Sequence, residues 1–300
     1  MAARAMRKIF EEFRRSLKLI DVEELADLYL TRPLAFLLVK AIRRTEITPN
    51  QLTMISMAVG VLGGVAYGLG RPWSIVLGAV GLALSMVFDC ADGQLARLKK
   101  NGTPLGRILD GVIDYVVMIA AYVGLAVGLD PGPGRRTVWL LLMAAAGASN
   151  IFHSGILDYY RVRYLERVQG EHNDIDSEIR EFQGELDKMK NEPRGGLKRG
   201  IVRIYLGYLG NQKRLTPTRP SPRPLSPEER TEFARHNKGV MRGWTFLGSG
   251  TFGVLMVVTT LIGRFDLYLW GRIVAGNLLA VILFAVQARI DRAAERAPAS

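Results

Sequence analysis

The chain has 300 residues, a net charge of +12 and 49% hydrophobic residues, a length that allows one large domain or two small ones. Its single cysteine, Cys90, excludes an internal disulfide. Apolar runs of about twenty residues alternate with segments dense in Arg and Lys, and such a run can cross a bilayer core of roughly 30 Å as a helix. This distribution argues against an ordinary soluble domain.

Two amphipathic segments precede the first apolar run. Residues 5–20 place apolar side chains on one helical face and predict a helix that lies in the lipid headgroup plane. A second short amphipathic piece is expected around 24–44, with an interruption at Pro33. Thr48 is expected to cap the next helix, with Pro49 at its first position.

Six apolar runs predict an all-α integral membrane protein with six transmembrane helices. The expected spans are about 51–70, 72–96, 105–129, 136–160, 243–263 and 266–288. Helices are expected because backbone polar groups in lipid must be paired within the segment that carries them.

The spans and the segments between them predict four consecutive regions. These are an N-terminal juxtamembrane segment (1–48), spans 1–4 (49–161), a basic cytoplasmic insertion (162–240), and spans 5 and 6 with a C-terminal tail (241–300). Within the insertion, 174–191 predicts a charged surface helix, 197–212 is basic and amphipathic, and 216–227 is a Pro-rich linker that cannot form a helix.

The positive charge follows the loops in a regular way. Arg and Lys are dense before span 1, after spans 2 and 4, and at the C-terminus, whereas the alternate loops hold only Arg71, Arg135, Arg136 and Arg264. Cytoplasmic loops carry such an excess, so both termini are expected on the cytoplasmic side of the cell membrane. Topology and attraction to lipid headgroups then account for most of the charge, and no nucleic-acid partner is expected.

The stretch "FDCADGQLARLKKNGTPLGRILDGVIDYVVM", residues 88–118, places carboxylates inside two apolar runs. One helical face near the end of span 2 would carry Asp89, Asp92, Gly93 and Ala96, and one face near the start of span 3 would carry Gly106, Asp110 and Asp114. The joining loop is short, so the two faces can meet. Both faces would then lie near the cytoplasmic ends of their spans.

Four such carboxylates need compensation. An Asp at the centre of a spanning helix costs about 2.5–3.5 kcal/mol, so an uncompensated cluster would rival the stability of a whole domain. Protonation, basic partners or metal ions could compensate, and two divalent cations would balance the charge of the four Asp. Carboxylate oxygens favour Mg²⁺ or Mn²⁺ over Zn²⁺.

Two glycines and an arginine indicate what such a cluster could act on. Gly93 and Gly106 clear space beside the carboxylates, and Arg97 can reach a phosphate. Together these features favour phosphoryl transfer from a nucleotide. A cation or proton pathway and a purely structural network are the alternatives, because intramembrane Asp clusters also occur in transporters.

The spacing Asp-x2-Asp-Gly-x2-Ala-Arg-x8-Gly-x3-Asp-x3-Asp, from Asp89 to Asp114, resembles the signature of the CDP-alcohol phosphotransferase family. The "TPNQLT" stretch before span 1 is also similar to that family, and the resemblance covers roughly residues 33–165. It implies a six-helix membrane enzyme, usually a homodimer, with a polar cavity open to the cytoplasm.

The resemblance also implies roles for individual residues. In such enzymes a hydroxyl of an acceptor attacks the β-phosphorus of a CDP-alcohol and CMP is released. Asp89, Asp92 and Asp110 would ligate two metal ions, and Asp114 would complete the cluster and act as general base. The residues implied to lie near the CDP group are Gly93, Ala96, Arg97, Gly106, Asn50 and Thr53.

The substrates are implied less directly. "DGQLAR" and six spans favour CDP-diacylglycerol as donor, and "DYYRVRYL" is similar to a bacterial subgroup associated with inositol-phosphate lipids. Inositol 1-phosphate is the expected acceptor, with glycerol 3-phosphate and serine as alternatives. Its basic pocket could draw on Arg161, Arg163, Arg242 and Arg289, although an Arg at a cytoplasmic helix end is also a common topology anchor.

Overall fold

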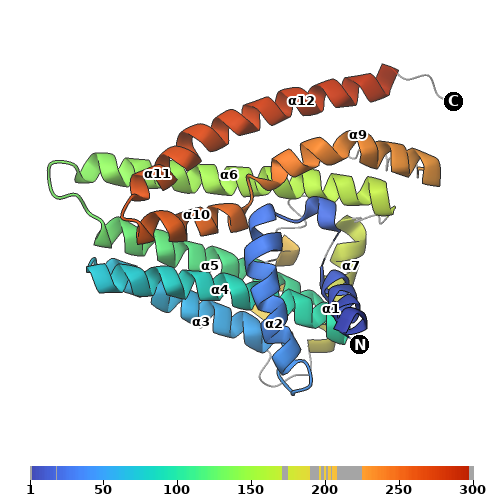
Figure 1. The fold of residues 1–300 in the computed structure, drawn as a ribbon, viewed down its shortest axis with the longest axis horizontal. Helices are drawn as coiled ribbons and strands as arrows, with labels where there is room; N and C mark the ends of the chain where they lie inside the picture. Colours follow the sequence, from blue (N-terminus) through green and yellow to red (C-terminus); the bar gives the residue numbers. More distant parts are fainter. Residues whose placement is uncertain are drawn as a thin grey trace.

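The computed structural model describes residues 2–17, 19–170, 175–189, 196, 199–200, 202–203, 205–207 and 225–296. Most of the expected amphipathic segment 197–212 and residues 216–224 of the Pro-rich linker lie outside the described residues. Every regular element in the described part is helical (Figure 1).

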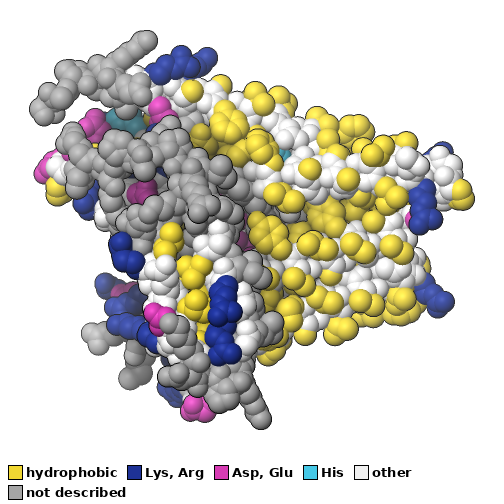
Figure 2. All heavy atoms as spheres, turned by 180° about the vertical axis from the view of Figure 1, so that it is seen from behind, with side chains coloured by type: hydrophobic (Ala, Val, Ile, Leu, Met, Phe, Trp, Pro, Cys, Tyr) yellow, Lys and Arg dark blue, Asp and Glu magenta, His cyan; other side chains and the backbone are white. Residues whose placement is uncertain are grey.

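Six helices or helix pairs are long and apolar enough to cross a membrane, which confirms the prediction of an all-α integral membrane protein. They are Pro49–Gly68, Pro72–Lys99, Ile108–Gly128, Arg136–Gln169, Pro227–Leu261 and Phe265–Arg292. Figure 2 shows hydrophobic side chains over most of one face of the bundle, with Lys and Arg gathered mainly toward one end. The N-terminal helix and the end of the last helix lie at the same end of the bundle (Figure 1).

Helices α3 (Pro49–Gly68), α4 (Pro72–Lys99) and α5 (Pro104–Gly128) form a closely packed layer. Glycines permit the close approach of α3 to α5, because a Cβ on Gly124 would overlap the carbonyl oxygen of Gly64. Small residues at such contacts let helix backbones approach within a membrane, where burial of apolar surface supplies little driving force. The glycines therefore bring the second half of α3 against the second half of α5.

The predicted start of the first span is confirmed. Thr48 accepts a hydrogen bond from the backbone N–H of Gln51 and Pro49 occupies the first turn, so the helix begins with a capping box. Pro33 does not interrupt a helix as expected. It lies in the first turn of α2 (Arg32–Ile42), directly after a short π-helix, η2 (Asp27–Thr31), because proline is tolerated where the backbone N–H needs no helical partner.

The expected fourth and fifth spans differ from the structure. Helix α6 (Arg136–Gln169) runs nine residues past the expected end at 160, and α9 (Pro227–Thr245) begins well before the expected start at 243. The expected fifth span over 243–263 falls largely within the candidate span Pro227–Leu261, but it is not one uninterrupted helix. The chain turns at 246–248 and a separate helix, α10 (Ser249–Leu261), completes the crossing. The break falls beside Gly248, Ser249 and Gly250, a small polar stretch within the otherwise apolar run.

The last span is also irregular. It begins with α11 (Phe265–Trp270), continues through a π-helix, η4 (Gly271–Gly276), and ends with α12 (Asn277–Arg296). Helix α9 packs on α6, and α10 packs on α4, so α10 links the α3–α5 layer to the rest of the bundle (Figure 1).

The expected charged helix in the insertion is present as α7 (Ile175–Lys188). Its Phe182 is buried in a small hydrophobic cluster together with Ile108 of α5 and Val202. The insertion therefore packs against the first turns of α5, next to the acidic stretch.

Candidate active site

The acidic faces of α4 and α5 meet at one end of the bundle, as the sequence predicts. Asp89, Asp92 and Asp110 each offer a carboxylate oxygen, and these three oxygens lie within 4.8 Å of one another. Asp92 is buried, and the other two side chains are partly buried. Three carboxylates this close in an apolar setting repel one another strongly unless a cation or protons lie between them.

Asp114 occupies the outer side of this group. Its carboxyl contacts that of Asp89, but its side chain is exposed, and it lies outside the group of three mutually close oxygens. It lies one turn beyond Asp110 on α5, beside the cluster.

Thr53 of α3 fixes the orientation of one carboxylate. Its hydroxyl donates a hydrogen bond of 2.5 Å to Oδ2 of Asp92, and both side chains are buried. Sequence similarity places Thr53 near the nucleotide, whereas the structure gives it contact with an acidic side chain. Such an outer partner determines which way a carboxylate points toward a cation.

Gly106 accommodates a side chain from a neighbouring helix. A Cβ at Gly106 would lie 2.9 Å from Oδ1 of Asn50, and Thr103 accepts the backbone N–H of Gly106 at 3.0 Å. Asn50 therefore lies directly over the start of α5. The absence of a side chain at Gly106 makes room for Asn50. Asn50 then forms part of the surface beside the carboxylates.

Gly93 leaves room for the guanidinium of Arg97. A Cβ at Gly93 would lie 3.3 Å from Nη2 of Arg97, one turn further along α4. The Nε of Arg97 donates a 2.5 Å hydrogen bond to the carbonyl oxygen of Ser16, at the end of α1 (Ala2–Ser16). Ala96 follows on the same face of α4 and is partly buried.

The residues present fit a divalent metal. All donors in the group are carboxylate oxygens, the ligand type that hard divalent cations prefer. Oδ1 of Asp89 is buried without a hydrogen-bond partner among the described residues, which is costly unless a cation contacts it.

Comparison with known proteins relates this region to a family. Residues 46–166 match the family model of CDP-alcohol phosphatidyltransferases, and the match contains all four acidic residues. This part of the chain is therefore similar to the CDP-alcohol phosphatidyltransferase family.

The chain is similar to several curated members of the family. It is 29% identical over 141 residues to the phosphatidylinositol phosphate synthase of Corynebacterium glutamicum, covering 45% of this chain and 57% of that protein. It is 34% identical over 106 residues to the phosphatidylinositol phosphate synthase of Mycolicibacterium smegmatis, covering 34% of this chain and 45% of that protein. A bifunctional IPC transferase and DIPP synthase of Rubrobacter xylanophilus is 30% identical over 120 residues, which span 40% of this chain and 25% of that protein. The chain thus spans only a quarter to just over half of the length of these relatives.

The four arginines expected to bind an acceptor have different contacts among the described residues. Nε of Arg161 donates to the carbonyl oxygen of Val22 at 3.3 Å, and its guanidinium pairs with Asp158 at 3.1 Å and Glu24 at 3.8 Å. Arg242 donates to the carbonyl oxygen of Glu23 at 2.9 Å.

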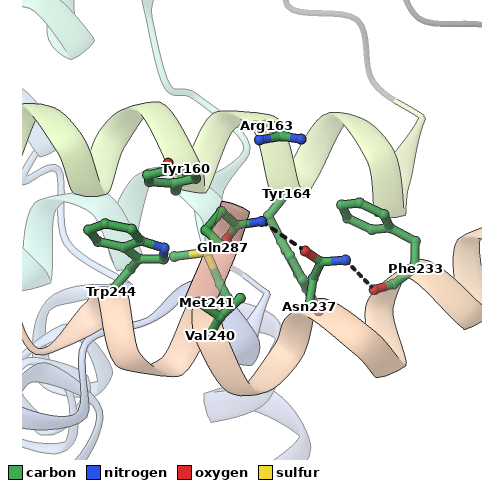
Figure 3. A pocket seen from close by; sticks show the side chains of 9 residues that line it. All are labelled: Tyr160, Arg163, Tyr164, Phe233, Asn237, Val240, Met241, Trp244 and Gln287. Atoms are coloured by element: carbon green, nitrogen blue, oxygen red, sulfur yellow. Dashed lines mark hydrogen bonds between the residues drawn. The ribbon is translucent and has the colours of Figure 1, made fainter. Parts of the chain in front are cut away.

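The other two candidate arginines lie on a different side. Arg163 pairs with Asp291 of α12 at 2.9 Å, and Arg289 is exposed on α12. Figure 3 shows Arg163 at a small pocket between α6, α9 and α12. Its lining residues are Tyr160, Arg163, Tyr164, Phe233, Asn237, Val240, Met241, Trp244 and Gln287. Four of the nine lining residues are aromatic, with Tyr160 stacked on Trp244 at 4.3 Å, and Arg163 is the member of the four arginines that lines it.

Glu24 carries a buried carboxyl group next to the site. Nothing in the sequence indicates that this residue is buried. Its Oε2 accepts the backbone N–H of Thr251 at 2.8 Å, at the first turn of α10. Gly248 and Gly250 leave space for Glu24 and Asp27, because a side chain at either glycine would overlap a carboxyl group. Burial, reinforced by the nearby charge of Asp27, raises the pKa of Glu24 to about 7.

Thr53→Val should lower the affinity of the protein for Mn²⁺ by about tenfold or more, because Asp92 loses the hydrogen bond that orients its carboxylate. Thr53→Ser retains the hydroxyl and should keep the affinity. Titration of the detergent-solubilised protein with Mn²⁺, followed by electron paramagnetic resonance, measures this. Equal affinities in the Val and Ser variants would show that Thr53 does not orient a metal ligand.

Glu24→Gln should raise the thermal stability of the protein above pH 7 and leave it unchanged below about pH 4.5. A carboxyl whose pKa is higher in the folded chain than in the unfolded chain binds its proton more tightly when folded. Its ionisation therefore destabilises the fold progressively between about pH 4.5 and 7, by up to about 3 kcal/mol. Unfolding midpoints across this pH range, with Glu11→Gln on the exposed face of α1 as control, measure the effect. The idea fails if Glu24→Gln shows the same pH dependence as the unmodified chain.

Proposed function

We propose that the protein is a membrane transferase that moves a phosphatidyl group from CDP-diacylglycerol to inositol 1-phosphate and releases CMP. The observation that carries this proposal is the group of three carboxylates formed by Asp89, Asp92 and Asp110 within the family-matched region. An oxygen-only acidic site at the end of two spanning helices suits a pyrophosphate donor whose charge needs neutralisation.

The acidic residues have two roles in the proposed reaction, metal binding and proton acceptance. Asp89, Asp92 and Asp110, completed by Asp114, would hold two divalent cations, Mg²⁺ or Mn²⁺, which when bound neutralise the charge of the pyrophosphate. The carboxylate of Asp114 accepts the proton of the acceptor hydroxyl. The hydroxyl oxygen forms a bond to the β-phosphorus, the bond from that phosphorus to the CMP oxygen breaks, and CMP leaves.

The donor binds over the surface between α3, α4 and α5. Asn50 and the backbone at Gly93 and Gly106 form that surface, with Ala96 at its far side, and Thr53 holds Asp92 beneath it. The guanidinium of Arg97 lies over Gly93 and contacts a donor phosphate.

Inositol 1-phosphate is proposed as acceptor because the relatives named above include two phosphatidylinositol phosphate synthases. Arg161 and Arg242 are the proposed contacts to its phosphate, since both attach to the segment 22–23. Arg163 and Arg289 are weaker candidates, because they lie toward α12. Glycerol 3-phosphate and serine would use the same chemistry, and the family match favours transfer over the alternative of a cation or proton pathway.

We also propose the orientation and assembly of the protein. The end of α4 that carries the acidic residues contacts the N-terminal helix through Arg97 and Ser16, and Figure 2 shows Lys and Arg gathered mainly toward one end of the bundle, so the end that holds the N-terminal helix is proposed to face the cytoplasm. A homodimer is proposed from the family resemblance.

The purified protein should release CMP from CDP-diacylglycerol only when a divalent cation and an acceptor are both present, and fastest with inositol 1-phosphate. A panel of inositol 1-phosphate, inositol, glycerol 3-phosphate and serine, with chromatography of the lipid product, measures this. No CMP release with any acceptor would overturn the assignment, and a faster reaction with another acceptor would replace inositol 1-phosphate.

Asp114→Asn should lower turnover by about a hundredfold or more, because the amide cannot accept the proton of the attacking hydroxyl. Mn²⁺ binding should largely survive, since three carboxylates remain. Asp130→Asn, which removes an ion pair with Arg136 far from the site, serves as the matched control and should retain activity. Full turnover in Asp114→Asn would remove its role as general base.

A further inference from the structure

Residues 2–31, called here the N-terminal arm, precede the family-matched region and lie against the proposed site. Ser16, Val22 and Glu23 are nearly or fully buried, so the middle of the arm is part of the protein interior. The first helix of the arm, α1, docks on α2 through an edge contact of Phe13 with Phe36 at 5.3 Å and an ion pair of Glu12 with Arg43 at 3.2 Å.

The arm and the start of α2 follow one stripe along α4. Thr31 contacts Cys90 at 3.3 Å, the carbonyl oxygen of Arg32 accepts from Gln94 at 3.0 Å, and that of Ser16 accepts from Arg97. Cys90, Gln94 and Arg97 are spaced four and three residues apart, so they share one face of α4, beside the face that carries Asp89 and Asp92. The arm therefore borders the donor surface.

The same arm reaches the other side of the site. The carbonyl oxygens of Val22 and Glu23 accept hydrogen bonds from Arg161 of α6 and Arg242 of α9. Asp21 fixes this part of the arm, because it accepts from Tyr164 at 3.1 Å and pairs with Lys238 at 2.9 Å. Three arginines from three different helices are thus held by carbonyl groups within an eight-residue stretch of the arm.

A carbonyl partner suits an arginine that must bind phosphate. A neutral carbonyl fixes the direction of the guanidinium and leaves its full positive charge, whereas a carboxylate would neutralise it. Arg97 and Arg242 each use one donor in these bonds, and a guanidinium has five, so donors remain for an anion. The carbonyl of Ser16 also lies at the C-terminal end of α1, where the helix dipole favours a cation.

We propose that the N-terminal arm is a positioning element of the proposed transferase, which orients Arg97 for the donor through Ser16 and Arg242 for the acceptor through Glu23. Arg161 is held by the same arm through Val22, but its charge is shared with Asp158 and Glu24. This inference rests on the proposed function. Because separate parts of the arm hold Arg97 and Arg242, loosening each part should affect one substrate and spare the other.

The test measures KM for donor and acceptor separately, by CMP release, in variants of the full chain. Phe13→Ala loosens α1 and should raise KM for CDP-diacylglycerol about three- to tenfold, with KM for the acceptor changed by less than about twofold. Asp21→Asn should give the converse pattern. Phe10→Ala, which truncates an exposed side chain on the same helix, is the matched control and should change neither KM.

A double-mutant cycle separates positioning from general stability. In an Arg97→Lys background, Phe13→Ala should add less than about twofold to KM for the donor, because the interaction it disturbs is already absent. The inference about the arm is overturned if Phe13→Ala and Phe10→Ala have the same KM for the donor. It is also overturned if both KM values change in parallel in every variant. Either result leaves the proposed function standing. An unmodified chain without CMP release would overturn the proposed function itself.

Discussion

The burial of several carboxylates at the meeting point of two apolar helices is the constraint on which the rest of the structure depends. Three Asp oxygens within 4.8 Å cannot all remain charged in that setting without nearby positive charge. The surrounding elements hold the carboxylates in place. Glycines bring α3 against α5, Thr53 orients Asp92, and the short loop after α4 sets the two acidic faces against each other. The divalent cations proposed for the site would supply the positive charge.

The arginines around the cluster are arranged according to the same constraint. A guanidinium paired with one of the carboxylates would weaken the metal site, so Arg97 lies instead over Gly93 and bonds a backbone carbonyl. The carboxyl groups of Glu24 and Asp27 pack against Gly248 and Gly250, where α9 ends and α10 begins. Arg161 pairs with Glu24 there. The positive charge available for phosphate groups is thus kept apart from the negative charge available for metal.

The sequence predicts the parts of this arrangement that depend on local spacing. The positions of Asp89, Asp92, Asp110 and Asp114 place the acidic residues on two helical faces, and Thr48 with Pro49 predicts the start of α3 correctly. It does not predict the break between α9 and α10, because the residues on both sides of the turn are apolar or small. Nor does it predict that Glu24 meets Thr251, 227 positions away, since only the fold brings these residues together.

The most direct test of the account is the location of a bound metal ion. Anomalous diffraction from crystals grown with Mn²⁺ should show the strongest peaks among the carboxylates of Asp89, Asp92 and Asp110, with a donor nucleotide adjacent when CDP-diacylglycerol is added. Mn²⁺ bound elsewhere, with these three carboxylates in contact only with one another, would contradict the account.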